Sequence, residues 1–438
     1  MKGRNKLEEA SQFKVEDELK EEKTRWPKPN ADFFKLGIQE NRLILQCNPN
    51  LDEAFYDYAF DFKKAANILT THVLSHPRID RLDTYFFPIA FLYRHSLELI
   101  LKAIALKNIT GLEQGCQFVK DTFHNLSEIL TTIEPFISEI VRTNRDEFLW
   151  LQNLFYDMND IDRDSDSFRY PFSLKRDQGP FGESTKFFAI RPFFQEQLHI
   201  NLVAFASKME VAFSILNAYY KNDYMTRGSY KRYHPIFLEK GGAYYGQSVL
   251  GYSYSRNKFG PYVKGYTESA EFLVEYVRLN PKNKKYLFMP ICYLFRNGIE
   301  LAMKEILFEE CSCNFQEAAR KVNRKKHKLI GIFNIIEGEI LRHARPSDND
   351  KTIDHVRHYV TQLHGFDTEA DKFRYPVKKD LSPHFGLPVK LDFVAVTDFF
   401  SDLAHFFHGV FLMMSHQNEL QAEIEYENNQ MQREYNEY

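Results

Sequence analysis

The sequence predicts a mainly helical protein in which two similar helical bundles, each preceded by a short β-hairpin, form a pseudo-symmetric pair. The main observation is a stretch that occurs twice. Residues 87–102 read FPIAFLYRHSLELILK, and residues 289–304 read MPICYLFRNGIELAMK. Further matches follow both stretches in the same order, and a repeat of about 200 residues is too long for one solenoid unit. The chain is therefore expected to contain two domains of one kind.

The further matches are a second helix and a short loop. The helix is expected to start with HNLSEIL at His124 and with HKLIGIF at His327. The loop reads DSFRYP at 166–171 and DKFRYP at 371–376, and its proline is typical of a turn. Landmarks kept in one order, with variable lengths between them, indicate an internal duplication.

The duplicated stretch is expected to be a buried helix with a charged network. Its charged residues are Arg94, Glu98 and Lys102 in the first copy and Arg296, Glu300 and Lys304 in the second. Residues four apart lie on one face of a helix. The rest of the circumference is apolar, which is typical of a helix buried on most sides. An unpaired buried carboxylate is too costly to keep, so each glutamate is expected to be paired.

Composition limits the class of protein. The 438 residues carry a net charge of −3, which argues against a chain built as a whole for nucleic acid, so any polyanion site has to be local. The five cysteines form no CxxC pair, and the charged N-terminus has no apolar signal core. A reducing cytoplasm is therefore the expected compartment.

The expected elements follow from the periodicity of the chain. The organisation predicted is a charged arm (1–29), a first bundle domain (30–220), a linker (221–229), a second bundle domain (230–416) and a polar tail that continues the last helix and then frays (417–438). Within the first domain we expect a hairpin at 30–49 turning at Glu40 and Asn41, a helix at 52–76, a loop at 107–123 and helices from 124 to 158 broken near Pro135. The Gly- and Tyr-rich residues 221–262 are expected to hold the hairpin that opens the second copy.

Each domain closes with a long apolar helix, at 197–220 and 392–416. Lys208 and Glu210 in the first, and Asp398 and Asp402 in the second, lie near the middle of these stretches. Charges at the centre of a bilayer are costly, so we expect bundle helices and no membrane span. The two closing helices are expected to meet where the domains join.

The Arg-x3-Glu-x3-Lys helix, the His-x-Leu start of the next helix and the helical spacing resemble HEPN domains. The resemblance covers about residues 90–220 and 292–416, whereas the FRYP loop is not part of the general HEPN signature. It implies bundles of four or five helices that pair through their helices. Many HEPN proteins are metal-independent ribonucleases of toxin–antitoxin and antiphage systems, and others bind nucleotides, RNA or proteins without catalysis.

The HEPN ribonuclease motif is Arg-x4–6-His, and the resemblance places it at Arg357, His358 and His364. A histidine can move a proton from or to the ribose and an arginine can stabilise the phosphorane. Arg320 with His327, and Arg227 with His234, have the same spacing, so position alone selects the pair. The first copy has Gln152, Asn153 and Asn159 opposite these residues, which leaves at most one catalytic site.

A basic segment, RKVNRKKHK at 320–328, precedes the second helix of the second copy only. Its cations are Arg320, Lys321, Arg324, Lys325, Lys326 and Lys328. As a local cluster it could hold RNA phosphates, and the alternative is a solvated surface loop.

The charged network has two interpretations. The preferred one is structural: the glutamates tie down the FRYP arginines, Arg169 and Arg374, through bidentate pairs. The alternative is an anion pocket that includes His124 or His327. Histidine pairs at 355/358 and 405/408 have spacing that could suit zinc, but no cysteine or HExxH motif supports them, so neither a metal nor another cofactor is expected.

The function predicted first is a cytoplasmic HEPN-like protein of bacterial defence or toxin type that engages RNA through its second copy, as a metal-independent ribonuclease. The alternative is a non-catalytic module that docks a partner protein such as an antitoxin, or a second copy as a homodimer. A groove shared by Arg357, His364 and the basic segment would favour the first, and a His364 buried among apolar side chains would favour the second.

Overall fold

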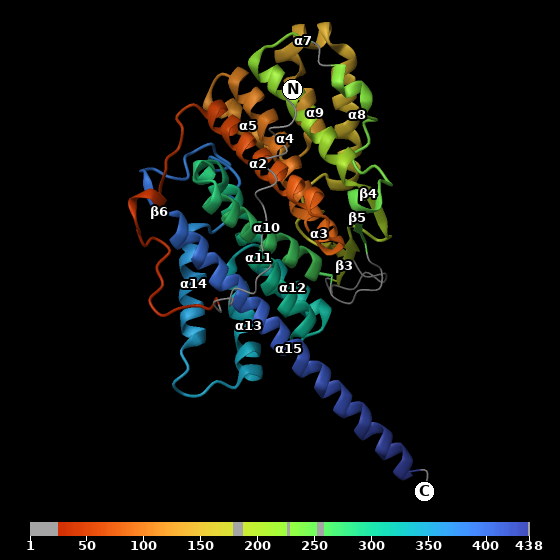
Figure 1. Ribbon diagram of the computed structural model, residues 1–438, viewed down its shortest axis with the longest axis vertical. Helices are drawn as coiled ribbons and strands as arrows, with labels where there is room; N and C mark the ends of the chain where they lie inside the picture. The colour runs from red at the N-terminus through yellow and green to blue at the C-terminus, as the bar shows by residue number, and fades with distance from the viewer. Residues whose placement is uncertain (1–24, 178–186, 226–227, 252–257, 437–438) are drawn as a thin grey trace.

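The computed structural model describes residues 25–177, 187–225, 228–251 and 258–436, and most of them are helical (Figure 1). The helices of the first copy are α2 (Leu51–Ser75), α3 (Ile79–Thr84), α4 (Phe86–Asn108), α5 (Leu112–Thr122), α6 (Leu126–Ile133), α7 (Ser138–Thr143), α8 (Arg145–Asp162) and α9 (Leu202–Lys221). Those of the second copy are α10 (Gly260–Leu279), α11 (Lys284–Glu305), α12 (Phe315–Lys325), α13 (Leu329–Ala344), α14 (Thr352–Phe366) and α15 (Phe393–Asn436).

The duplicated stretch forms most of α4 and most of α11, which confirms that it is helical and buried. Every residue from Phe86 to Ala105 is buried. Pro88 lies in the first turn of α4, where its missing N–H costs nothing, whereas Pro290 lies inside α11. Figure 1 shows both helices in the middle of the molecule, with the other helices around them.

The central contacts join the two copies through α2, α4, α10 and α11. Helix α2 packs against α4 and also against α11, and α10 packs against α11 and also against α4. Gly265 allows α10 to approach the end of α3, because a Cβ there would lie 2.1 Å from the carbonyl oxygen of Thr84. The expected meeting of the closing helices at this junction is wrong. Helix α9 packs on α4 and α15 packs on α11, each within its own copy.

In the described part of the chain, three two-stranded sheets lie at the edges of the helical body. They are β1 (Arg42–Leu45) with β6 (Val389–Asp392), β2 (Phe172–Asp177) with β3 (Phe187–Pro192), and β4 (Leu198–Asn201) with β5 (Gln247–Leu250), all antiparallel.

The expected hairpin in front of the first bundle is wrong. Residues Gln39–Asn41 form a 3₁₀ turn, and β1 pairs with β6, the strand that leads into α15. The carboxylate of Asp392 accepts the N–H of Gly37 at 3.0 Å and fixes this register. In the same way β5, which precedes the second bundle, pairs with β4, which leads into α9. Alternation of apolar residues identified a strand but not its distant partner.

Three other segments differ from expectation or complete it. The expected loop at 107–123 is mostly α5, whereas the break near Pro135 is confirmed by a 3₁₀ turn at Glu134–Ile137. Residues 1–24 of the expected arm lie outside the described residues, and its end is attached to α15. Arg25 and Lys28 pair with Asp398 and Asp402 at 3.0 and 3.2 Å.

Across the described ranges, no helix is both long enough and apolar enough to cross a bilayer.

Candidate functional site

Each central helix holds one buried glutamate inside a cluster of cations. In α4, the carboxylate of Glu98 binds Arg94 Nη1 at 3.0 Å and Lys102 Nζ at 2.7 Å. The helix alone brings these groups together, because they are one turn apart on one face. His124, at the turn before α6, adds its Nδ1 at 3.0 Å from Glu98 Oε1.

The second copy builds the same cluster in α11. The carboxylate of Glu300 lies 2.6 Å from both Arg296 Nη1 and Lys304 Nζ. The Nδ1 of His327 lies 2.9 Å from Glu300 Oε1. The guanidinium of Arg296 also donates to the backbone carbonyl of His327 at 2.6 Å, so the turn that carries this histidine is tied to the helix.

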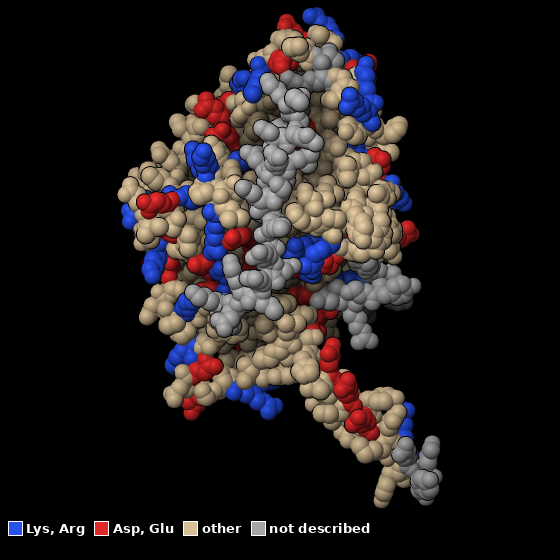
Figure 2. Space-filling view, viewed as in Figure 1, with Lys and Arg blue, Asp and Glu red and all other residues tan. Residues whose placement is uncertain are grey.

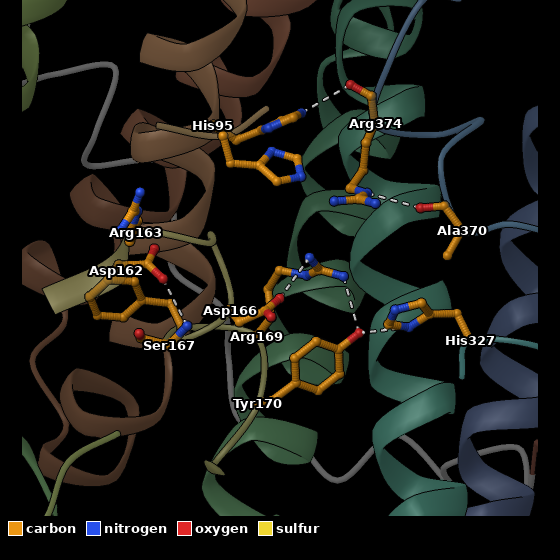
Figure 3. A network of polar contacts seen from close by, with 12 residues as sticks. His95, Asp162, Arg163, Asp166, Ser167, Arg169, Tyr170, His327, Ala370 and Arg374 are labelled. Atoms are coloured by element: carbon orange, nitrogen blue, oxygen red, sulfur yellow. Dashed lines mark hydrogen bonds and ion pairs between the residues drawn. The ribbon is translucent and has the colours of Figure 1, made fainter. Parts of the chain in front are cut away.

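A tyrosine from the opposite copy completes each cluster. The hydroxyl of Tyr375 lies 2.8 Å from Glu98 Oε1, and the hydroxyl of Tyr170 lies 3.2 Å from Glu300 Oε1. Figure 3 shows Tyr170 reaching from its loop toward His327. Burial raises the pKa of both tyrosines, so their hydroxyls stay protonated and can donate.

The expected pairing of the FRYP arginines with the helix glutamates is therefore wrong. Arg169 donates to Asp166 of its own loop at 3.3 Å and to the hydroxyl of Tyr170 at 3.0 Å. Arg374 donates to the carbonyl of Ala370 at 2.9 Å. The arginine stabilises the loop from within, as Figure 3 shows for Arg169 with Asp166 and Tyr170. The neighbouring tyrosine makes the contact with the glutamate of the other copy.

Two aspartates complete the network and were not among the predicted site residues. Asp162 Oδ2 lies 3.1 Å from Arg94 Nε, and Asp367 Oδ2 lies 3.4 Å from Arg296 Nε. The other oxygen of each aspartate accepts backbone N–H groups of the FRYP loop, such as that of Ser167 at 2.8 Å. The signal was present in the sequence, since NDID and HGFD end in the same aspartate before both loops.

The clusters hold charged carboxylates beside neutral imidazoles at pH 7. Burial acts to raise the pKa of Glu98 and Glu300, but the lysine and histidine partners outweigh it and hold both pKa values well below the usual range. For His327, Glu300 acts to raise the pKa, but burial and the charges of Lys304 and Arg169 lower it overall. Burial is the main cause that lowers the pKa of His124. A carboxylate acceptor at Nδ1 places the imidazole proton on that nitrogen.

The basic segment of the second copy forms a corner and is not a loop. Residues up to Lys325 belong to α12, and Lys326, with φ of 52°, turns the chain into α13. Lys321 pairs with Glu317 at 2.8 Å. The remaining cations are exposed and have no ion-pair partner among the described residues: Arg320, Arg324, Lys325, Lys326 and Lys328. We call these five residues the basic corner.

The first copy has the same turn without the charges. Phe123, with φ of 43°, stands where Lys326 stands and is 60 % exposed. Asn125 caps α6 by accepting the N–H of Glu128 at 3.2 Å. Helix α5 carries a single lysine, Lys120, in the segment QFVKDTFH. The two turns therefore differ in charge and share their backbone conformation.

The structure does not join Arg357 to His364. Both lie on α14, two helical turns apart, which is roughly 10 Å along the axis. The guanidinium of Arg357 donates to Asn334 at 2.9 Å and pairs with Glu337, so its charge is already neutralised. His358 is exposed on the same helix.

His364 is half-buried and lies toward the second cluster. Its Nδ1 is buried without a hydrogen-bond partner among the described residues. Burial lowers its pKa, and the positive charges of Arg296 and Lys328 lower it further. Of the predicted pair, the histidine is thus influenced by charges of the second cluster and of the basic corner, whereas the arginine pairs with a neighbouring helix.

Within the described parts of the chain, no group of three or more histidine, cysteine or acidic side chains is arranged to hold a metal ion. Comparison with protein-family models, curated proteins and solved structures found no match to this chain. The clusters and the basic corner are therefore the features from which a function is inferred.

Proposed function

We propose that this chain is a cytoplasmic HEPN-like protein of bacterial defence or toxin type that binds RNA through the basic corner. The observation that carries the proposal is the concentration of five exposed cations at the α12–α13 turn of a chain with a net charge of −3. Cations that already pair with carboxylates have little left to give a phosphate. These five have no such partner among the described residues, so they are available to replace the counterions of a nucleic acid.

We also propose that the two copies form a pseudo-symmetric pair of HEPN-like bundles. Two reciprocal exchanges support this. Each opening strand pairs with the strand before the closing helix of the other copy, and each FRYP tyrosine binds the glutamate of the other copy. In such a pair the basic corner breaks the symmetry, because the first copy presents Phe123 and Asn125 at the matching turn.

RNA binding is tested by fluorescence anisotropy with a labelled single-stranded RNA over a range of salt concentrations. Lys325→Gln with Lys326→Gln should weaken binding and reduce the slope of log Kd against log salt by about 1.4, since each phosphate contact on a single strand contributes about 0.7. Lys240→Gln with Lys282→Gln, at exposed lysines of other segments, is the control. An equal loss of RNA affinity in both double variants, or no RNA binding by the wild type, would disprove an RNA site at the basic corner.

The second candidate function is protein interaction through the end of α15, which projects beyond the rest of the molecule (Figure 1). Leu420, Ile424 and Met431 are exposed along one side of this end. Residues 417–432 contain four glutamates and no lysine or arginine, and Figure 2 shows the acidic side chains along the projection. An acidic helix with an apolar stripe fits a basic partner. The partner that we propose is the basic corner of a second molecule of this protein.

The basic corner of the same molecule is out of reach for the projecting end of α15. Phe407 contacts Phe333, and Asn418 contacts His343, so α15 runs alongside α13 in the same direction. The basic corner lies at the start of α13, and the projection continues past its end. Because α13 spans 16 residues, the projection starts about 24 Å from its own corner and leads away from it.

The test is size-exclusion chromatography with light scattering. The wild type should dimerise at low salt and dissociate at high salt. Glu423→Lys with Glu427→Lys should abolish the dimer, as should Lys325→Glu with Lys326→Glu, and a mixture of the two variants should dimerise again. A wild type that is monomeric at every salt concentration, or a dimer that both charge reversals leave intact, would refute this contact.

A further inference from the structure

The ring of His327 is held in one orientation by two partners on the same edge. Its Nδ1 lies 2.9 Å from Glu300 Oε1 and 3.1 Å from the hydroxyl of Tyr170. The carboxylate that orients it is itself almost fully buried, at 1 % exposure. The Nε2 edge points the other way and has no hydrogen-bond partner among the described residues, and 39 % of the side chain is exposed.

This arrangement prepares the free nitrogen to accept a proton. The Nδ1 proton is donated to a charged carboxylate, so the lone pair of a neutral imidazole is on Nε2. Because the pKa of His327 is lowered overall, the ring is neutral near pH 7. A positively charged imidazolium would be stabilised by Glu300, which is the role of an orienting carboxylate in acid–base catalysis.

In the chain, His327 lies between two residues of the basic corner. Lys326 and Lys328 flank His327 in the chain, and both are exposed. A phosphate held by these two ammonium groups would therefore lie beside His327. The first copy offers the same fixed histidine without the cations, since His124 is flanked by Phe123 and Asn125.

We propose that His327 is the general base of an RNA-cleaving site, with Glu300 as its positioning residue. The proposal rests on RNA binding at the basic corner. It assigns catalysis to the α12–α13 turn instead of to Arg357 and His364 on α14.

The step needs no metal and no co-reactant. His327 Nε2 takes the proton of a ribose 2′-hydroxyl, and the 2′-oxygen forms a bond to the adjacent phosphorus while the bond from phosphorus to the 5′-oxygen breaks. The 5′-oxygen takes a proton from water, and the imidazolium returns its proton to solvent. The products are a 2′,3′-cyclic phosphate and a 5′-hydroxyl. Lys326 and Lys328 would stabilise the negative charge that develops on the phosphorane.

The duplication supplies a matched control for the test. His327→Gln and His124→Gln each remove one imidazole from a cluster of Glu, Arg, Lys and Tyr, so both should lower thermal stability by similar amounts. Only His327→Gln should lower the rate of RNA cleavage. The rate should fall by at least about 100-fold, which is the lower end of what a general base contributes. Binding measured by anisotropy should be unchanged, because glutamine removes no cation.

The assay uses a labelled single-stranded RNA and an all-2′-deoxy strand of the same sequence. The wild type should cleave the RNA to fragments ending in a cyclic phosphate and should bind the deoxy strand without cleaving it. The rate should rise with pH until the imidazole is neutral and then level off, a profile that a structural role would not produce. His364→Gln should retain activity.

Three results would overturn the proposal. The first is RNA that the wild type binds but does not cleave, which would overturn the catalytic role of His327 and leave the proposed RNA binding standing. The second is equal loss of cleavage in the His327 and His124 variants, in step with their stability. The third is an inactive His364→Gln beside an active His327→Gln, which would return catalysis to α14. Failure of the wild type to bind any RNA would overturn RNA binding and cleavage together.

Discussion

The tyrosines that connect the two copies should contribute measurably to stability, and Tyr375→Phe isolates that contribution. The substitution keeps the buried ring and removes only the hydroxyl, which lies 2.8 Å from Glu98 Oε1 and 3.2 Å from His124 Nδ1. A hydrogen bond to a charged group contributes about 1.5–3 kcal/mol. Glu98 keeps Arg94, Lys102 and His124, so it is not left unpaired and the lower end, about 1.5 kcal/mol, is expected.

The measurement is urea unfolding followed by circular dichroism. Tyr375→Phe should shift the midpoint downward without changing the m-value, because the surface exposed on unfolding stays the same. Tyr170→Phe should cost more, since it removes the contact with Glu300 at 3.2 Å and also the acceptor of the buried Arg169 at 3.0 Å. Tyr244→Phe, at a tyrosine that is 61 % exposed, is the control. A loss below about 0.5 kcal/mol for Tyr375→Phe would show that the contact between the copies contributes little.

Three further outcomes are expected. His95 is buried beside the carbonyl of Arg374, and burial lowers the pKa of its imidazole to about 3. As pH drops below 6.5, the unfolded state therefore binds a proton at His95 before the folded state does. The free energy of unfolding should fall by roughly 1.4 kcal/mol per pH unit in this range. His95→Asn, which copies Asn297 of the second copy, should flatten urea midpoints over this pH range, and an unchanged slope would contradict the assignment. Residues 1–225 and 228–438 expressed separately should be insoluble or aggregated and should co-purify when expressed together, whereas two independently folded halves would disprove the exchange. Asn159→Ala should leave RNA binding and cleavage as in the wild type, and so should a chelator, since the proposed mechanism uses neither a side chain of α8 nor a metal.

The sequence predicted those features that depend on residues close together in the chain. The spacing of Arg94, Glu98 and Lys102 placed three charges on one helix face, and the structure has them in contact. The apolar circumference predicted burial of that helix correctly. The break near Pro135 also followed from local chemistry, because proline removes a backbone donor.

What could not be predicted depends on partners far away in the chain. Apolar alternation identified β1, but a strand of four residues contains no information about which distant strand it joins. The FRYP loop was recognised, yet a charge argument selected Arg169 over Tyr170, because guanidinium–carboxylate pairs are strong in general. The carboxylate had already been satisfied by its own helix, so a neutral donor was sufficient.

The predicted pair of Arg357 and His364 shows the same difficulty on a smaller scale. The spacing of Arg357 and His364 matched a motif, but spacing does not reveal that Glu337 of α13 neutralises the arginine. Asp162 and Asp367 could have been found, since both copies kept them directly before the loop. Their role depends on contacts with Arg94 of α4 and Arg296 of α11, which are about 70 residues earlier in the chain.

The pairing of β1 with β6 has a consequence for synthesis of the protein in the cell. Arg42 lies opposite Asp392, so the partner of β1 leaves the ribosome about 350 residues later, or roughly 18–70 s later at ordinary translation rates. During that interval the nascent first copy has an unpaired strand edge, and Glu98 lacks a tyrosine that is 277 residues further along. Cotranslational folding of the first copy therefore cannot reach completion, and ribosome-associated chaperones are expected to hold it until the last helix emerges.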